Sequence, residues 1–210
     1  NMFKLILIQT LIHAFRKGGG AFGVCAFYMI IVTLFTFALG PKGMHDHAGA
    51  VMCVAMLLAS ITALPLLFER DFEDGTMEQF LLQPVALEWV VCAKLLGQWF
   101  AMILPILAVS PLMALFANLD AQSMITVLTL LLLASPTIVA IGGVVAALTL
   151  GARRGGLLQA LITLPLYVPT LIFAASVGGQ GAVLLLMAMI CASFPLSCLI
   201  CAALIRISSD

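Results

Sequence analysis

Six long apolar runs dominate this sequence, and only short connections separate them. Each run approaches or exceeds the roughly twenty apolar residues that a helix needs to cross a membrane. We expect spans at residues 20–39, 48–68, 89–116, 124–150, 157–177 and 182–205. Because 64% of the residues are hydrophobic and only 9% are charged, the chain cannot cover a water-soluble surface. The connections leave no room for a soluble domain, so the sequence predicts a single all-α transmembrane domain over residues 1–210.

The basic residues indicate how the spans are oriented, since Lys and Arg are retained on the cytoplasmic side. With the N-terminus inside, eight of the nine basic residues fall on the inner side and only Lys42 falls outside. The inner eight are Lys4, Arg16, Lys17, Arg70, Lys94, Arg153, Arg154 and Arg206. We therefore expect both termini in the cytoplasm. The formal net charge of zero gives no reason to expect nucleic acid as a partner.

The segment before the first span, residues 2–17, predicts a helix that lies along the cytoplasmic membrane surface. Gln9, His13, Arg16 and Lys17 recur at helical spacing, and mostly apolar residues fill the rest of the helix. Arg16 and Lys17 stand where a signal peptide would have a small-residue cleavage site. An interfacial helix therefore fits this segment better than a signal peptide.

The spans have the features of a packed helical bundle without an energy source. Prolines kink several of them, and the pair Gly142-Gly143 allows close contact between helices. No ionisable residue lies at mid-depth in any predicted span, so the charge relay of ion-coupled transporters is missing. The sequence also has no G-x-x-x-x-G-K-[ST] nucleotide motif. Energy for any transport would have to come from another protein.

Two small groups of residues suggest other chemistry. Cys198 and Cys201 form a C-x-x-C, but without a neighbouring cation or His we interpret them as apolar packing residues. His45 and His47 flank an acid in the predicted outer loop, where they could offer an axial haem ligand or a metal pair. We favour solvated loop residues for these two histidines.

The one dense polar segment, residues 69–88, lies between the second and third predicted spans. Thr76 and Gln79 predict a capping box at the start of a short helix. Met77 and Phe80 give that helix an apolar face. An ordinary solvated loop is the simpler interpretation, but it accounts for neither the cap nor the apolar face. We interpret the segment as a docking element for a cytoplasmic partner.

The same segment carries a resemblance to a known family. Glu69-Arg70-Asp71 and Asp74-Gly75-x-x-Glu78-Gln79, followed by Pro84, resemble the cytoplasmic loop of the haem exporter protein B family, also called CcmB. The similarity extends over nearly the whole chain, with further matches such as Pro136-Thr137 and Arg153 to Gly156. Proteins of that family are the membrane permease subunits of the cytochrome c maturation ABC complex.

The resemblance implies an ABC-2-like exporter permease in the bacterial inner membrane, with residues 2–17 as its elbow helix. It implies as partners two copies of a cytoplasmic ABC ATPase, a second copy of this chain, a haem-handling membrane subunit, a small single-span subunit and a haem chaperone. ATP would bind the ATPase and haem a partner subunit, so this non-catalytic chain would hold no cofactor directly. Its role would be to transmit ATPase motions to release of the haem-loaded chaperone.

The resemblance also assigns the residues that contact the ATPase. The coupling loop would present Glu69, Arg70, Asp71, Asp74, Gly75, Thr76, Met77, Glu78, Gln79 and Phe80. Arg153 and Arg154 would lie in the cytoplasmic loop between the fourth and fifth spans.

Two other functions remain open. A permease of a different ABC exporter, for lipid, polysaccharide or drug, would use the same kind of loop. A membrane-interface hydrolase could use Asp71 and Asp74 as paired carboxylates for acid–base work or to hold a metal. No nucleophile–base pair accompanies these acids, so we rank the hydrolase last.

Overall fold

The protein is described here from a computed structural model, which covers residues 6–8, 10–12, 20–64, 67–68, 87–150, 155–175 and 180–208. The helices in these ranges are α2 (Gly20–Ala63), α5 (Leu87–Phe116), α6 (Ala121–Leu148), α7 (Gly155–Ala175) and α8 (Gln180–Ser208). Residues 6–8 and 10–12 are helical too. For this part of the chain the expected all-α class is confirmed.

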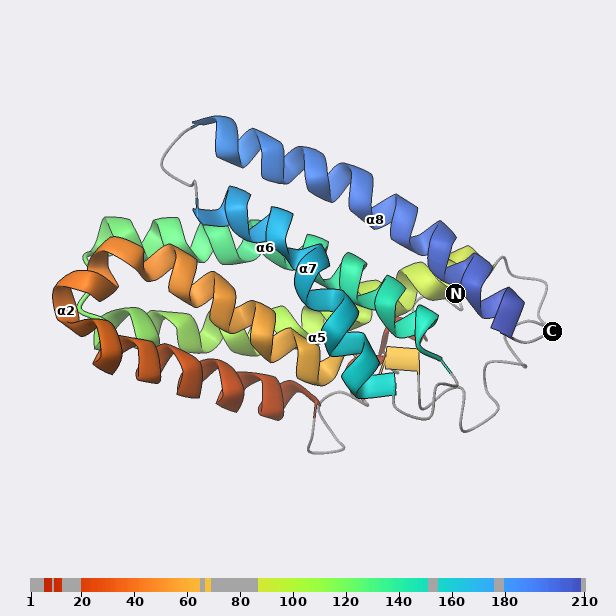
Figure 1. Ribbon diagram of the computed structural model, residues 1–210, viewed down its shortest axis with the longest axis horizontal. Coiled ribbons are helices and arrows are strands. Elements are labelled where there is room, and N and C mark those ends of the chain that lie inside the picture. Colours follow the sequence, from red (N-terminus) through yellow and green to blue (C-terminus); the bar gives the residue numbers. More distant parts are fainter. Residues whose placement is uncertain are drawn as a thin grey trace.

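Helix α2 consists of two arms that meet at Gly40. Gly40 has φ 68° and ψ 175°, a conformation that side chains exclude, and the chain reverses direction there (Figure 1). Helix resumes directly after it, because Pro41 suits the first turn of a helix. The prediction of a loop ahead of residue 48 is therefore wrong. His45 and His47 are exposed residues of a helix rather than of a loop.

Five described segments are long and apolar enough to cross a membrane. They are Ala21–Gly40, Lys42–Ala63, Leu87–Phe116, Ala121–Leu148 and Val183–Ile207. The apolar stretch of α7, Leu158–Ala174, is shorter than these. Six spans were expected, and the described helices provide five of full length and this shorter one.

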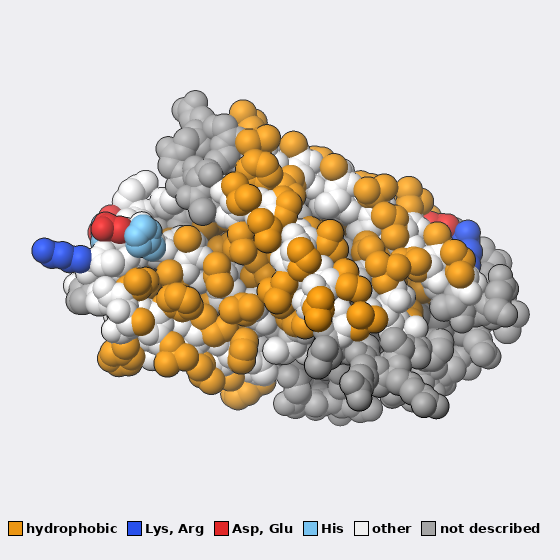
Figure 2. All heavy atoms as spheres, in the orientation of Figure 1, with side chains coloured by type: hydrophobic (Ala, Val, Ile, Leu, Met, Phe, Trp, Pro, Cys, Tyr) orange, Lys and Arg blue, Asp and Glu red, His pale blue; other side chains and the backbone are white. Residues whose placement is uncertain are grey.

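The helices run roughly along the long axis of the molecule (Figure 1). The bend of α2 and the α5–α6 turn lie at one end, whereas α5 begins and α8 ends at the other. Figure 2 shows charged side chains at both ends of the visible face and mainly hydrophobic ones between them. Because charged groups are costly in hydrocarbon, this distribution suits a bundle that crosses a membrane lengthwise.

The second arm of α2 and helix α6 form the centre of the bundle. In their most apolar stretches 56% and 50% of the residues are buried, against 22% in the first arm of α2 and 17% in α8. The largest fully buried side chains include Tyr28, Tyr167, Phe68, Met44, Met52 and Met56. All six cysteines are free, and Cys198 and Cys201 are buried in α8. In lipid such contacts contribute through packing and hydrogen bonds, because lipid tails are as apolar as the side chains.

Gly142 in α6 allows three helices to meet closely. A Cβ at this position would collide with the Leu64 side chain at the end of α2 and lie 2.8 Å from the Tyr167 hydroxyl oxygen of α7. That hydroxyl donates to the Ile138 carbonyl of α6 at 3.0 Å. The close helix contact predicted from the pair Gly142-Gly143 is thus confirmed.

A serine compensates for the proline in α6. Pro136 has no N–H to offer the carbonyl of Leu132, four residues earlier. The Ser135 hydroxyl donates to that carbonyl at 2.9 Å, and the indole N–H of Trp99 in α5 donates to Ser135 at 2.8 Å. The freed backbone group is therefore satisfied inside the protein, as the membrane interior requires. The same contact joins α5 to α6.

Candidate functional site

The predicted coupling loop itself lies outside the described residues. This applies to Glu69, Arg70, Asp71, Asp74, Gly75, Thr76, Met77, Glu78, Gln79 and Phe80, and equally to Arg153 and Arg154. The structure does describe the two points where the loop leaves and re-enters the bundle. Phe68 precedes the loop, and α5 begins at Leu87, so the last two residues of the predicted segment 69–88 already belong to a helix. The surroundings of these two points define how the loop is attached.

The first attachment point is Phe68, which packs beneath a lysine of α5. The Lys94 ammonium lies 5.8 Å from the centre of the Phe68 ring, within the range of a cation–π contact. Phe68 and Lys94 are only 1% and 5% exposed, so this contact is sealed from solvent. Lys94 lies seven residues into α5, about 10 Å along its axis. The contact links the start of the loop to the body of α5.

The second attachment point is Glu88, in the first turn of α5. Its carboxylate lies 2.9 Å from the guanidinium of Arg206, in the last turn of α8. An acid at a helix N-terminus and a base at a helix C-terminus each interact favourably with the dipole of their own helix. The pair therefore joins two complementary helix ends where the loop re-enters the bundle.

The N-terminal segment contacts α5 near the same end. A Cβ at Gly97 would lie 2.8 Å from Thr10 Cβ and 3.4 Å from the Leu7 carbonyl oxygen, so only a glycine allows this approach. Ile6 is buried, and the Thr10 hydroxyl donates to its carbonyl at 2.9 Å. The polar residues predicted to face the cytosol, Gln9 and His13 among them, lie outside the described residues.

At this end of the bundle, the described residues on both sides of the predicted loop make side-chain contacts. Both ends of the loop are held, one by a contact within the core and one by an ion pair. Of these contacts, the first involves α5 and the second joins α5 to α8. The sequence predicted the loop but not its attachments, because Glu88 and Arg206 are 118 residues apart and no local pattern pairs them.

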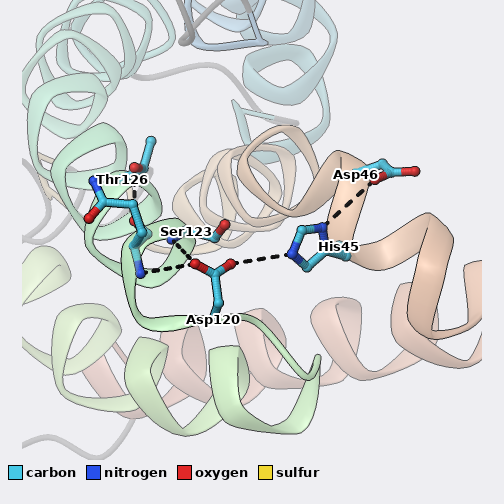
Figure 3. Close-up of polar contacts among 6 residues, drawn as sticks. His45, Asp46, Asp120, Ser123 and Thr126 are labelled. Carbon is cyan, nitrogen blue, oxygen red and sulfur yellow. Dashed lines mark hydrogen bonds and ion pairs between the residues drawn. The ribbon is translucent and has the colours of Figure 1, made fainter.

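The opposite end holds a second polar cluster, shown in Figure 3. Asp120 caps α6, accepting the backbone N–H groups of Gln122 and Ser123 at 3.2 and 3.3 Å. His45 in α2 lies between two acids, with Nε2 at 3.3 Å from Asp120 and Nδ1 at 3.7 Å from Asp46. Hydrogen bonds from Ser123, and a further one from His45, lower the pKa of Asp120 to about 2.

Sequence reasoning overlooked Asp120, although its signal was present. An Asp directly before a long apolar helix is a common N-cap. In the turn before it, Asn118 has φ 59°. The backbone N–H of Leu119 donates to the carbonyl of Ala114, and that of Asn118 donates to the carbonyl of Leu115. This is the usual pattern of a helix that ends in a left-handed residue, which Asn tolerates. In the described part of the chain no three His, Cys, Asp or Glu residues come together as a metal site would need.

Comparison with known proteins settles the family. The sequence model for the family described as CcmB protein matches residues 1–208. The chain belongs to the CcmB family. Several relatives are named heme exporter protein B, and the one from Rhodobacter capsulatus is 40% identical over 85% of this chain and 83% of its own length. The Pseudomonas aeruginosa protein is also 40% identical, over 87% of this chain and 80% of its own.

The similarity extends over the whole length of one of these relatives. The Haemophilus influenzae relative is 35% identical over 100% of this chain and 99% of its own length. The resemblance inferred from the loop motif is therefore confirmed. Together with the long apolar helices, membership of the family makes this chain a multi-pass protein of the bacterial inner membrane.

Proposed function

We propose that this protein is the transmembrane permease subunit of an ABC transporter complex for haem delivery or export in cytochrome c biogenesis. The observation that carries the proposal is the match to the CcmB family over residues 1–208, together with relatives named heme exporter protein B. The chain would be non-catalytic, with ATP hydrolysed by a separate cytoplasmic ATPase. The absence of a G-x-x-x-x-G-K-[ST] motif from its sequence agrees with ATP hydrolysis by another protein.

In the proposed complex this chain transmits ATPase motions to release of a haem-loaded chaperone. Two ATPase copies would act on two copies of this chain, beside a haem-handling membrane subunit and a small single-span subunit. Haem would be held by a partner and ATP by the ATPase, so this chain would hold neither cofactor. Both termini and residues 69–88 would face the cytoplasm, where Met77 and Phe80 would enter a groove of the ATPase.

The attachment of the loop supports this transmission role. The contact of Phe68 with Lys94 and the ion pair of Glu88 with Arg206 connect the two ends of the loop to α5 and α8. A loop held in this way can pass a displacement into the bundle.

The experiment is purification of the tagged chain from membranes of its own host. We expect an ATPase and a haem-containing membrane protein to copurify with it. An ATPase without a haem protein would instead favour an exporter of lipid, polysaccharide or drug. Hydrolytic activity of the isolated chain, lost in Asp71→Asn, would favour the hydrolase.

A pair of variants tests the loop itself. Met77→Asp combined with Phe80→Asp removes the apolar face, so we expect the ATPase to be lost while the chain still inserts in the membrane. The matched control combines Met77→Leu with Phe80→Leu, which keeps the face apolar and should retain the ATPase. Normal ATPase recovery with the aspartate variant would show that these residues do not form the docking face.

A further inference from the structure

The ion pair between Glu88 and Arg206 lies where the predicted loop meets the last helix of the chain. Glu88 is the last residue of the predicted segment 69–88 and lies in the first turn of α5, and Arg206 is in the last turn of α8. The two side chains are 2.9 Å apart and are 32% and 56% exposed. An ion pair with this exposure contributes little to the free energy of folding. Its position is therefore more informative than its strength.

Helix α8 is held mainly at the end that carries this pair. Cys198, Cys201, Ala202 and Ile205 are all at most 8% exposed. Toward its other end Leu186 is buried, but Leu184, Leu185 and Met187 around it are between 48% and 69% exposed. Only 17% of the most apolar stretch of α8 is buried in this chain, the smallest share among the full-length spans. Buried residues are thus more frequent in α8 at the end that carries the pair than toward its other end.

We infer that Glu88 and Arg206 are a positioning pair that carries movement of the coupling loop into α8. A displacement at the start of α5 would act on α8 at its packed end through this contact. The less packed part of α8, near the opposite membrane surface, would then swing furthest. The inference rests on the proposed function, because it needs an ATPase that moves the loop.

Charge reversal tests the pair directly. Glu88→Arg and Arg206→Glu each place like charges together, and the double variant restores an opposite pair in reversed order. We expect each single variant to lower c-type cytochrome formation per ATP hydrolysed by at least about fivefold, the lower end of typical coupling between two sites. The double variant should recover most of that loss, and Arg206→Lys, which keeps the charge, should lose much less.

Three controls separate the possible failures. Lys42→Glu reverses an exposed charge just after the bend of α2, at the other end of the bundle, and should leave the coupling unchanged. The amount of assembled complex and its thermal midpoint are measured for every variant, because a purely structural pair would lower these and leave output per complex intact. Copurification of the ATPase with the unmodified chain tests the proposed function separately.

The outcomes then divide clearly. The inference is supported if the single variants keep their ATPase but form less c-type cytochrome per ATP hydrolysed, and if the double variant recovers that ratio. Normal coupling in the single variants overturns it, as does a double variant that stays uncoupled or a loss confined to complex abundance. If the unmodified chain brings down no ATPase, it is the proposed function that fails.

Discussion

Two threonines of α7 differ in how their hydroxyl groups are satisfied. The Thr163 hydroxyl donates to the Gln159 carbonyl at 2.6 Å, the usual arrangement for a threonine inside an apolar helix. Thr170, two turns further along, is fully buried, and its hydroxyl has no hydrogen-bond partner among the described residues. A buried hydroxyl without a partner costs roughly 1–3 kcal/mol of folding free energy.

Replacing the hydroxyl of Thr170 by a methyl group should therefore stabilise the protein. We expect Thr170→Val to raise the thermal midpoint in detergent, with each 1 kcal/mol gained corresponding to roughly 2–4 °C for a chain of this size. Thr163→Val is the control in the same helix. It loses the hydrogen bond to the Gln159 carbonyl, which keeps its backbone partner, so the thermal midpoint should change little or fall. A drop in the midpoint of Thr170→Val would mean that its hydroxyl has a partner in the native protein.

Asp120 makes a contribution to stability that depends on pH. Its pKa is lowered from 3.8 to about 2 by the hydrogen bonds at the start of α6 and by His45. A carboxyl whose pKa is lower in the folded state stabilises the fold above its ordinary pKa, and this contribution disappears as pH falls through the folded value. The contribution should therefore be complete near neutral pH and be lost between about pH 4 and pH 2.

The prediction compares Asp120→Ala with the unmodified protein by thermal unfolding across this range. The difference between their midpoints should be largest near neutral pH and should shrink as the pH approaches 2. Asp46→Ala is the control, since Asp46 is more exposed and caps no helix. A difference that stays constant down to pH 2 would show that the charge of Asp120 does not contribute.

At the scale of helices, the glycine pair of α6 differs between its two members. A methyl group at Gly142 would meet Leu64 and the hydroxyl of Tyr167, which is fully buried and bonded to Ile138. A methyl group at Gly143 would clash only with the end of the flexible Leu95 side chain. The neighbours of Gly142 are therefore less able to move aside than the neighbour of Gly143.

We expect Gly142→Ala to destabilise the bundle by roughly 1–3 kcal/mol, the usual cost of overpacking a tight core. Gly143→Ala should cost less, because Leu95 can change its rotamer. Gly23→Ala is the control, since nothing lies within 4 Å of the added methyl group. Thermal unfolding in detergent measures all three. Equal losses for Gly142→Ala and Gly23→Ala would mean that α6 does not approach its neighbours as described.

The sequence predicted the elements better than it predicted their arrangement. Apolar runs indicated the helices, and the pair Gly142-Gly143 indicated a close contact, because both features depend on residues near one another in the chain. Which helices lie at the centre was not predictable. Helices α6 and α8 are both strongly apolar, although half of one and only 17% of the other is buried, so hydropathy does not separate the central helix from the peripheral one.

The attachments of the candidate site were missed for a related reason. Phe68 and Lys94 are separated by the whole predicted loop, and Glu88 and Arg206 by most of the chain. Their pairing depends on the tertiary fold. The loop motif could be recognised from the sequence because its predicted cap, its acids and its apolar residues are close together in the chain. Whether that loop contacts an ATPase stays a prediction, since its residues lie outside the described part.

At the scale of the whole molecule, the charged residues fall at opposite ends of one bundle. Of the Asp, Glu, Lys and Arg residues that the structure describes, Glu88, Lys94 and Arg206 belong to the end where α5 begins. Lys42 and Asp46 follow the bend of α2, and Asp120 precedes α6 at the same end as that bend. The bundle thus has two distinct polar ends. The proposed function requires the end where α5 begins to face the cytoplasm.

Labelling of single added cysteines determines which end faces which side. Lys42 and Ile207 are exposed residues near opposite ends, so Lys42→Cys and Ile207→Cys are the informative variants. With a maleimide that cannot cross the inner membrane, we expect Lys42→Cys to react in spheroplasts and Ile207→Cys to react only after lysis. The unmodified chain gives the background from its six cysteines, none of which lies at these two positions.

The reverse labelling pattern would have a wider consequence than a wrong orientation. Eight of the nine basic residues would then lie outside, against the retention of Lys and Arg in the cytoplasm. Phe68 and Glu88 would attach the loop to the bundle on the outer side, where no ATP-hydrolysing partner could reach it. The transmission role of the loop and the positioning role of Arg206 would both be excluded by that single result, whereas membership of the CcmB family would stand.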